Sequence, residues 1–212
     1  MKITIFINEP HGWFLPWAEQ LKMALEKKQH EVDLVHDVQD IKQGDIAFYL
    51  ACTVMISEKK LTLHQHNLVC HPSKLPEGRG MSPLTWEILA GRNEIFMTLF
   101  EAVKAMDAGD IYYQDVLHFE GHELNDELKD AQGRKTVELC LRFVNDYPAG
   151  VKGIPQEGEP TFYRRRKPED SQLDVNKTIA EQFDLLRVVD NERYPAYVEY
   201  RGHKYLIKIF RA

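Results

Sequence analysis

Two side chains with acid–base chemistry occupy defined places relative to the expected strands. His71 follows the apolar run Leu68-Val69-Cys70 and precedes Pro72, so it lies where a buried strand stops. A histidine at a strand end suits proton transfer, because its imidazole changes charge near neutral pH. Asp107 follows 36 residues later, in the turn Asp107-Ala108-Gly109-Asp110. Taken singly, each residue also has a structural explanation, as a buried histidine or a turn-capping aspartate.

The elements that must position these residues alternate along the chain between strands and helices. Alternating or unbroken apolar runs predict strands at Lys2–Ile7, Glu31–Val35, Ile46–Ala51, His66–Cys70, Met97–Phe100 and Ile111–Phe119. Helical spacing predicts helices at Trp17–Lys28, Ser82–Leu89 and Glu123–Tyr147, with Ser82 as an N-cap before Pro83. This order predicts an α/β fold with a doubly wound, mostly parallel, Rossmann-like sheet. The loops after Ile7, Ala51 and Cys70 should meet at its ligand-binding carboxyl edge.

The chain divides at a stretch rich in glycine and proline. Residues 1–149 are predicted as a catalytic core, and Ala149–Pro160 as a linker. Residues 150–212 then comprise this linker and a small C-terminal α+β appendage that binds substrate. The appendage is expected to contain a helix at Asn176–Val188 and a hairpin from Tyr197 to Phe210 that turns at Arg201-Gly202.

Composition narrows the class of protein. With 43% apolar and 28% charged residues among 212, the chain can bury a core. The net charge of −6 disfavours nucleic acid as a partner. Three cysteines without a Cys-x-x-Cys pair fit a reducing compartment. No apolar run is long enough to span a membrane, and the first residues are too short for a signal peptide. We therefore expect a cytoplasmic protein without a membrane partner.

A longer pattern joins the two candidate residues. From His71 to Pro83 the sequence reads His-x-Ser-x-Leu-Pro-x-x-Arg-Gly-x-x-Pro, and Asp107 begins Asp-Ala-Gly-Asp-Ile. With its fixed interval, this pattern resembles the folate-dependent formyltransferases, which include methionyl-tRNA, glycinamide ribonucleotide and sugar-nucleotide enzymes. The resemblance is clearest over residues 46–114. It implies a formyltransferase that uses 10-formyltetrahydrofolate, with His71 and Asp107 as catalytic residues.

The resemblance also implies a mechanism of direct transfer. A neutral amine attacks the formyl carbon, and a positioned donor stabilises the oxyanion that develops. His71 would move the amine proton, and Asp107 would stabilise the resulting imidazolium. The mechanism requires no metal and no covalent enzyme intermediate.

One position departs from the family pattern, which has asparagine two residues before the histidine. Val69 stands there, and Asn67 lies on the same strand face roughly 7 Å farther back. We predict that Asn67 is the catalytic donor, brought forward by a bulge. The alternatives are a donor from Asn8 or His66, or an Asn67 that only satisfies backbone groups at the strand start.

The folate pocket of the family is built from two apolar loops. The corresponding loops here predict folate contacts from Val54, Met55, Ile56, Phe100 and Val103. The alternative for each residue is ordinary packing at the top of the sheet.

The acceptor follows from a finer resemblance. Residues 161–176, followed by Arg187, resemble the corresponding region of sugar-nucleotide N-formyltransferases. Residues 66–71 and 82–86 most resemble the branch that acts on UDP-linked 4-amino-4,6-dideoxy sugars in the pseudaminic acid pathway. We predict a nucleotide-linked amino sugar as acceptor, with contacts from Asn8, Trp13, Lys74, Arg79, Arg164, Arg165 and Arg166. The arginines would bind a pyrophosphate, and Trp13 would stack on a base or sugar. The alternatives are a solvated charge run and a core tryptophan.

Other functions fit less of the sequence. A methionyl-tRNA formyltransferase-like enzyme for another amine, a non-catalytic folate or nucleotide-sugar binding module, and a formyl-folate hydrolase all remain open. A metal site at His64, His66 and His71 lacks a completing ligand. A dinucleotide site lacks the glycine-rich turn. Cys70, next to His71 in the strand, should point to the opposite sheet face.

Overall fold

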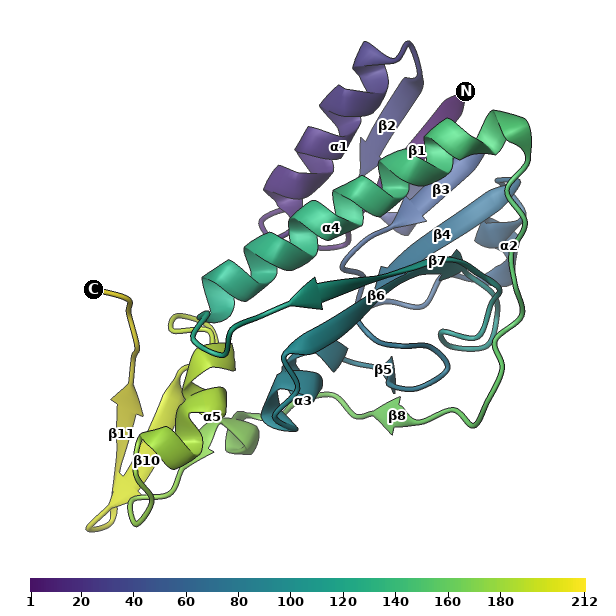
Figure 1. The fold of residues 1–212 in the computed structure, drawn as a ribbon. Helices are drawn as coiled ribbons and strands as arrows, with labels where there is room; N and C mark the ends of the chain where they lie inside the picture. Colours follow the sequence, from purple (N-terminus) through teal and green to yellow (C-terminus); the bar gives the residue numbers. More distant parts are fainter.

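The computed structural model describes residues 1–212, and a six-stranded sheet runs through it in the order β2-β1-β3-β4-β6-β7 (Figure 1). These strands are β1 (Lys2–Phe6), β2 (Glu31–Val35), β3 (Ile46–Tyr49), β4 (His66–His71), β6 (Glu94–Glu101) and β7 (Ile111–His118). The first four are parallel, whereas β6 runs antiparallel to β4 and β7 antiparallel to β6. The mostly parallel α/β sheet predicted from the sequence is therefore confirmed, with an antiparallel pair at one edge.

Two long helices cover one face of this sheet. They are α1 (Leu15–Lys27) and α4 (Asn125–Asp146), which lie side by side across the strands (Figure 1). Leu21 and Leu25 of α1 share the main core cluster with Ile3 and Ile5 of β1, as their alternating and helical spacings require. Gly133 allows the two helices to approach, because a Cβ at this position would lie 2.4 Å from the Trp17 ring.

The opposite face is covered by shorter elements. A smaller cluster of Phe6, Ile41, Ala47 and Tyr49 lies under η1 (Val38–Asp40), α2 (Glu58–Leu61) and the loops around them. Val69 packs against this cluster. Because side chains alternate along a strand, His71 points to the same face as Val69.

A short helix follows the His71 loop. It is α3 (Pro83–Leu89), preceded by the two-residue strand β5 (Arg79–Gly80). Ser82 stands at the N-cap position, but its φ is +55° and its side chain makes no capping hydrogen bond. The helix was predicted correctly and the serine cap was not.

The segment predicted as a linker is bound to the core. After α4 the chain passes through η2 (Tyr147–Ala149) and then runs as residues 150–163, here called the strap, back to β5 (Figure 1). Ile154 forms a β-bridge with Ile111, and β8 (Phe162–Tyr163) pairs in parallel with β5. The glycines and prolines therefore shape an extended path over the core.

The C-terminal appendage contains short elements and a three-stranded sheet, β11-β10-β9. Its elements are η3 (Pro168–Ser171), β9 (Gln172–Leu173), η4 (Ala180–Gln182), α5 (Phe183–Val188), β10 (Ala196–Tyr200) and β11 (His203–Ile207). The hairpin and its Arg201-Gly202 turn are confirmed. The predicted helix is wrong over residues 176–179, where Asp174 and Glu181 accept backbone N–H groups and stabilise turns.

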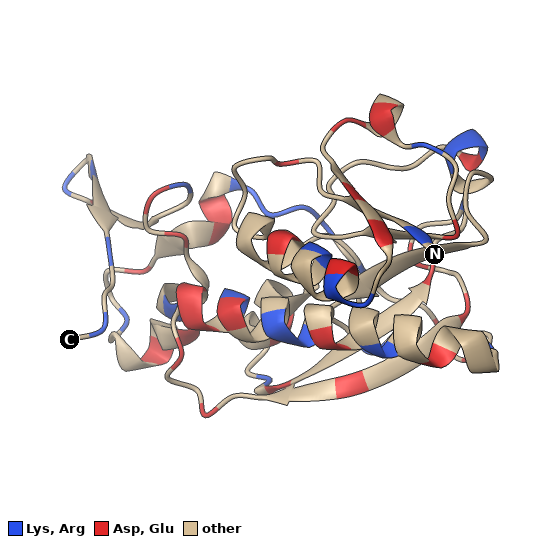
Figure 2. Cartoon of the chain, turned by 90° about the horizontal axis from the view of Figure 1, so that it is seen from above, with Lys and Arg blue, Asp and Glu red and all other residues tan.

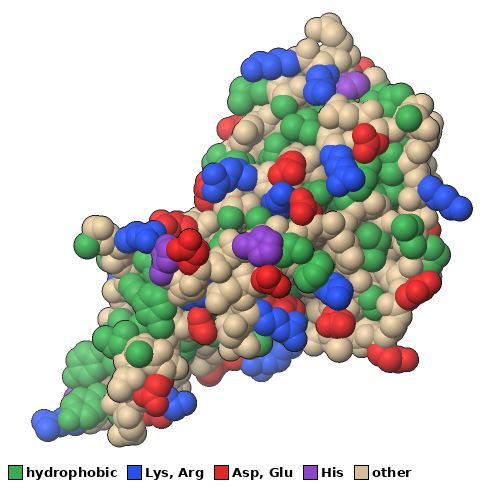
Figure 3. Space-filling view, in the orientation of Figure 1, with side chains coloured by type: hydrophobic (Ala, Val, Ile, Leu, Met, Phe, Trp, Pro, Cys, Tyr) green, Lys and Arg blue, Asp and Glu red, His purple; other side chains and the backbone are tan.

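Buried charge joins the appendage to the core. Arg187 of α5 is fully buried and donates to the carbonyl and carboxylate of Glu123 and to Asn93 Oδ1. The hairpin beyond projects from the body, and exposed apolar side chains such as Tyr205 and Leu206 gather on it (Figure 3).

The surface carries mixed charge over the long helix. Acidic and basic residues alternate along α4 (Figure 2), so its exposed face is not a basic stripe. None of the helices combines the length and apolar character needed to cross a bilayer.

Candidate active site

The fold brings His71 and Asp107 together, although 36 residues separate them. His71 Nε2 lies 3.9 Å from Asp107 Oδ2. Their side chains are 9% and 16% exposed, so both belong to a sheltered site that still opens to solvent. At this separation a carboxylate attracts the imidazole electrostatically when the ring is protonated.

The position of His71 leaves one ring nitrogen free. His71 ends β4, pairs with Thr98 of β6, and packs edge-on against Phe100 with ring centroids 6.4 Å apart. Its Nε2 lies 2.9 Å from the Gly78 carbonyl oxygen. Because a carbonyl can only accept, Nε2 donates the hydrogen, and Nδ1 is the acceptor nitrogen of the neutral ring. Nδ1 has no hydrogen-bond partner in the chain.

Asp107 is held in a backbone conformation that few non-glycine residues adopt. Its φ is +51°, in the left-handed region. The Gly80 N–H donates to Asp107 Oδ2 at 2.8 Å. Gln156 of the strap donates from Nε2 to the carbonyl oxygens of Asp107 and Gly109, both at 2.9 Å. Gly80 must be glycine, because its φ is +100° and a Cβ would lie 2.3 Å from the Tyr163 carbonyl oxygen.

The structure argues against the donor role predicted for Asn67. Asn67 is buried, its Nδ2 donates to the Leu61 carbonyl at 2.8 Å, and its Oδ1 accepts from the Tyr49 hydroxyl at 3.2 Å. Strand β4 stays in regular register with β3, so no bulge moves Asn67 toward His71. Its amide fixes the start of the strand, which was the structural alternative.

The two substitute donors also have partners. Asn8 Oδ1 accepts from the Thr53 N–H at 2.9 Å and its Nδ2 donates to Thr53 Oγ1 at 3.0 Å, which joins the loops after β1 and β3. His66 begins β4, at the opposite end from His71, and its Nδ1 lies 3.1 Å from both Glu101 Oε2 and the Tyr112 hydroxyl. The strand direction therefore places His66 away from the candidate site.

The two loops predicted to contact folate lie next to each other. Lys104 forms an ion pair with Glu58 at 3.3 Å, and Cys52, Ile56 and Ala102 pack against the same cluster. Exposed apolar side chains cover these loops: Val54, Met55, Val103 and Met106 are 44%, 60%, 41% and 43% exposed. Phe100 is buried and packs edge-on against His71, so it supports the histidine ring rather than offering a surface to the folate.

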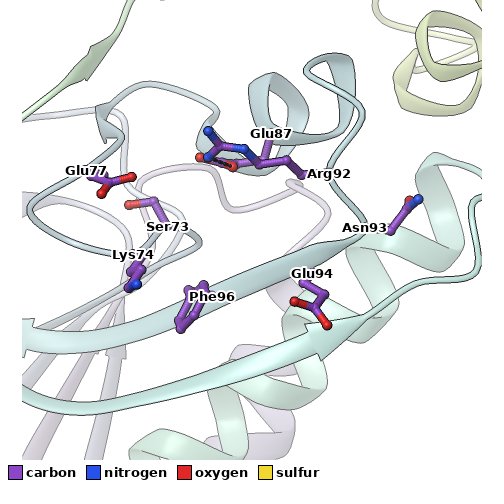
Figure 4. A pocket seen from close by; sticks show the side chains of 8 residues that line it. All are labelled: Ser73, Lys74, Glu77, Glu87, Arg92, Asn93, Glu94 and Phe96. Atoms are coloured by element: carbon purple, nitrogen blue, oxygen red, sulfur yellow. Dashed lines mark hydrogen bonds and ion pairs between the residues drawn. The ribbon is translucent and has the colours of Figure 1, made fainter.

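A polar pocket of about 340 Å³ continues from the His71 loop along β6 (Figure 4). Thr98, which pairs with His71, donates to the Ser73 carbonyl at 2.6 Å, and Phe96 comes next on the same strand face. Eight residues line the pocket: Ser73, Lys74, Glu77, Glu87, Arg92, Asn93, Glu94 and Phe96. Ser73 Oγ is buried without a hydrogen-bond partner, and Lys74 Nζ lies 5.2 Å from the centroid of the Phe96 ring.

The predicted arginine cluster is mostly engaged within the chain. Arg164 forms a bidentate pair with Asp170 at 2.5 and 2.7 Å, and this pairing lowers the pKa of Asp170 well below its ordinary range. Arg166 donates to the Asp170 carbonyl and to Ser171 Oγ. Arg165 is exposed. The pyrophosphate role predicted for Arg164 and Arg166 therefore conflicts with their internal partners.

Two further predicted contacts also have internal partners. Arg79 donates to Gln156 Oε1 at 2.6 Å, and Trp13 packs edge-on against Phe14 beside the main core. The core alternative thus describes Trp13 better than stacking on a ligand.

The remaining alternatives concern cysteine and metal. Cys70 packs against the main core, on the other sheet face from His71, and burial raises the pKa of its thiol to about 12. A thiol so rarely ionised is a poor nucleophile. No three His, Cys, Asp or Glu side chains are arranged to hold a metal ion.

Sequence reasoning missed the contribution of the strap to this site. Besides Gln156, Thr161 Oγ1 accepts from the Gly78 N–H at 2.8 Å and the Thr161 carbonyl accepts from the Arg79 N–H at 2.9 Å. These contacts join positions about 80 residues apart, and no local pattern marks them.

Comparison with known proteins gives a family match. The family model described as formyl transferase matches residues 10–144. A methionyl-tRNA formyltransferase of Mycoplasma capricolum is 27% identical over 197 residues, which cover 88% of this chain and 61% of that protein. The chain thus spans about three fifths of the length of this curated relative.

Solved structures share the fold. HypX from Aquifex aeolicus, in complex with tetrahydrofolic acid, matches with a TM-score of 0.81 and 19% identity over 99% of this chain and 37% of its own. Rv3404c from Mycobacterium tuberculosis, described as a likely sugar N-formyltransferase, matches with a TM-score of 0.78 and 16% identity over 98% and 96%.

Proposed function

Because the chain belongs to the formyl transferase family, we propose that it transfers a formyl group from 10-formyltetrahydrofolate to the amine of a nucleotide-linked amino sugar. The observation that carries the proposal is the pair of His71 and Asp107, 3.9 Å apart at the carboxyl end of β4. Ligands bind at this edge of open α/β sheets.

We assign the proton transfer to His71 Nδ1, which has no partner in the chain. Nδ1 takes the proton from the attacking amine, and the ring becomes an imidazolium that keeps its Nε2 hydrogen bond to Gly78. The bond between the formyl carbon and the folate nitrogen then breaks, and the imidazolium returns the proton to that nitrogen as tetrahydrofolate leaves. The Asp107 carboxylate, oriented by the Gly80 N–H, stabilises that positive charge. General acid–base groups of this kind contribute typically about 10²–10⁴-fold to the rate.

The two apolar loops suit the folate. When bound, 10-formyltetrahydrofolate supplies the formyl group. Val54, Met55 and Val103 are exposed apolar side chains that would cover its flat ring, and Ile56 and Ala102 pack the two loops against one apolar cluster. The HypX structure of the same fold was determined with tetrahydrofolic acid.

The polar pocket supports a small acceptor. Its volume of about 340 Å³ falls in the range of small-molecule sites, and its walls are polar except for Phe96. Glu87 is paired with Arg92 at 2.6 Å, and the carboxylates of Glu77 and Glu94 add acceptors for the hydroxyl or amine hydrogens of a sugar. Lys74, without an ion-pair partner, is free to contact a phosphate. The net charge of −6 disfavours tRNA as the acceptor.

The finer identity of the acceptor stays a proposal from the resemblance. We propose a UDP-linked 4-amino-4,6-dideoxy sugar, bound by residues 1–149 as the catalytic core and by residues 150–212. The likeness to Rv3404c, described as a likely sugar N-formyltransferase, supports a sugar acceptor. In the appendage, Arg165 is the arginine still exposed for a phosphate.

The test is mass spectrometry of a panel of acceptors incubated with the protein and 10-formyltetrahydrofolate. We expect the mass gain of one formyl group on a UDP- or dTDP-linked amino sugar, and none with His71→Ala. Lys74→Met should raise the acceptor KM and leave the folate KM unchanged. Formylation of methionyl-tRNA alone would replace the sugar proposal, and folate binding without any transfer would indicate a binding module.

A further inference from the structure

We infer that Gln156, in the strap, is a positioning residue that sets the Asp107 carboxylate against His71. The inference rests on the proposed function, because it assigns to Gln156 an effect on that same site. Gln156 touches none of the reacting groups, so it acts through Asp107.

The contacts of Gln156 use both ends of its amide. Oε1 accepts from Arg79 at 2.6 Å, and Nε2 donates to the carbonyl oxygens of Asp107 and Gly109 at 2.9 Å. Arg79 is cationic, and a donor of this kind makes short, strong hydrogen bonds. Polarisation of the amide by Arg79 strengthens donation from its other end. Arg79, Gln156 and Asp107 are therefore connected by one chain of hydrogen bonds.

Asp107 needs such a restraint. A left-handed backbone at φ +51° is unfavourable for aspartate and persists only when its surroundings fix it. The turn leads into Gly109, which is packed so closely that a Cβ would lie 1.8 Å from the Glu101 carbonyl oxygen. The two carbonyl oxygens on either side of Ala108 are the groups that Gln156 binds. Gln156 thereby fixes the turn that sets the orientation of the Asp107 carboxylate.

The strap also fixes the other side of the carboxylate. The Gly80 N–H, which donates to Asp107 Oδ2, belongs to β5, and β5 pairs with β8 at the end of the strap. Gly78, whose carbonyl accepts from His71, donates its own N–H to Thr161. The same segment thus holds both partners of the catalytic pair, and Gln156 is its direct contact with Asp107.

The test uses two variants of similar size. Gln156→Met removes both kinds of hydrogen bond. Gln156→Glu keeps an acceptor for Arg79 but turns an oxygen toward the carbonyls of Asp107 and Gly109. We expect kcat to fall about 10- to 100-fold in both, as for a displacement of roughly 1 Å, with both KM values within about twofold. In the Asp107→Asn background, Gln156→Met should have no further effect on kcat. Gln65→Met is the matched control, since Gln65 lies at the amino end of β4, away from the site, where it accepts a hydrogen bond from the Tyr147 hydroxyl.

A second readout does not need turnover. In protein with isotope-labelled histidine, the ring resonances of His71, assigned with His71→Gln, should shift in Gln156→Met and Gln156→Glu but not in Gln65→Met. Unmoved His71 resonances, or a kcat loss that adds to that of Asp107→Asn, would overturn the inference. A wild-type protein that formylates nothing would instead refute the proposed function, and the resonances would still decide the role of Gln156.

Discussion

Asn67→Ala separates a structural asparagine from a catalytic one. The substitution removes the amide that binds the Leu61 carbonyl and the Tyr49 hydroxyl, and Tyr49 is itself buried. A buried polar group left without a partner costs about 1–3 kcal/mol, so two such groups predict a loss of about 2–6 kcal/mol in the free energy of unfolding. Because neither group contacts His71, we expect kcat and kcat/KM to stay within about twofold of wild type.

The assay pairs urea unfolding, followed by tryptophan fluorescence, with steady-state kinetics on the same samples. Asn67→Ser, which keeps one donor, should lose less stability than Asn67→Ala. Val69→Asn provides the complementary test, since Val69 lies next to His71 on the same strand face. If the site lacks an amide donor, Val69→Asn should raise kcat.

The opposite pattern would refute this reasoning. A fall of more than about tenfold in kcat and kcat/KM, with less than about 1 kcal/mol of lost stability, would identify Asn67 as the hydrogen-bond donor to the oxyanion. The hydrogen bonds to Leu61 and Tyr49 would then describe only the resting protein.

Three further outcomes are expected. His71→Ala and Asp107→Asn should each lower kcat by about 10²–10⁴-fold in formyl-transfer assays, with melting temperatures near that of wild type. Arg187→Met should lower the free energy of unfolding by about 3–5 kcal/mol in urea, because it leaves Glu123 without its buried partner. The lowered pKa of Asp170 means that its pair with Arg164 adds stability above the unfolded-state pKa of about 4 and loses it as the pH falls further. Unfolding free energies of Asp170→Asn should therefore fall less steeply than those of wild type below about pH 4.

The sequence was a good guide wherever the relevant contacts were local or the periodicity was strong. The strand at Glu31–Val35 has the predicted bounds, and the hairpin turn at Arg201-Gly202 was read from its flanking strands. The spacing of His71 and Asp107 belongs to a family pattern, and the fold places their side chains 3.9 Å apart. These features depend on period, turn chemistry and a fixed interval.

Contacts between distant segments could not be predicted in the same way. The family pattern and strand-face geometry favour Asn67 as the donor, but neither reveals that Leu61 and Tyr49 occupy its amide. The sequence of the arginine run does not show that Arg164 has an internal partner. Asp170 reaches Arg164 only because the turn of η3 brings its carboxylate back toward the run. Gln156 carried no local signal, since an isolated glutamine in a segment with glycine and proline is typical of a loop.

The pairing of β5 with β8 has a consequence for synthesis on the ribosome. Residues 79–80 are made long before residues 162–163, and the two strands pair only after both have left the exit tunnel. Chains emerge from the N-terminus, so the central sheet can assemble while the strap is still being translated. A nascent chain that has reached only residue 149 would contain β4 with His71 but lack the contacts of Gln156 and Thr161. The site therefore matures only after residues 156–163 have been synthesised and have left the tunnel.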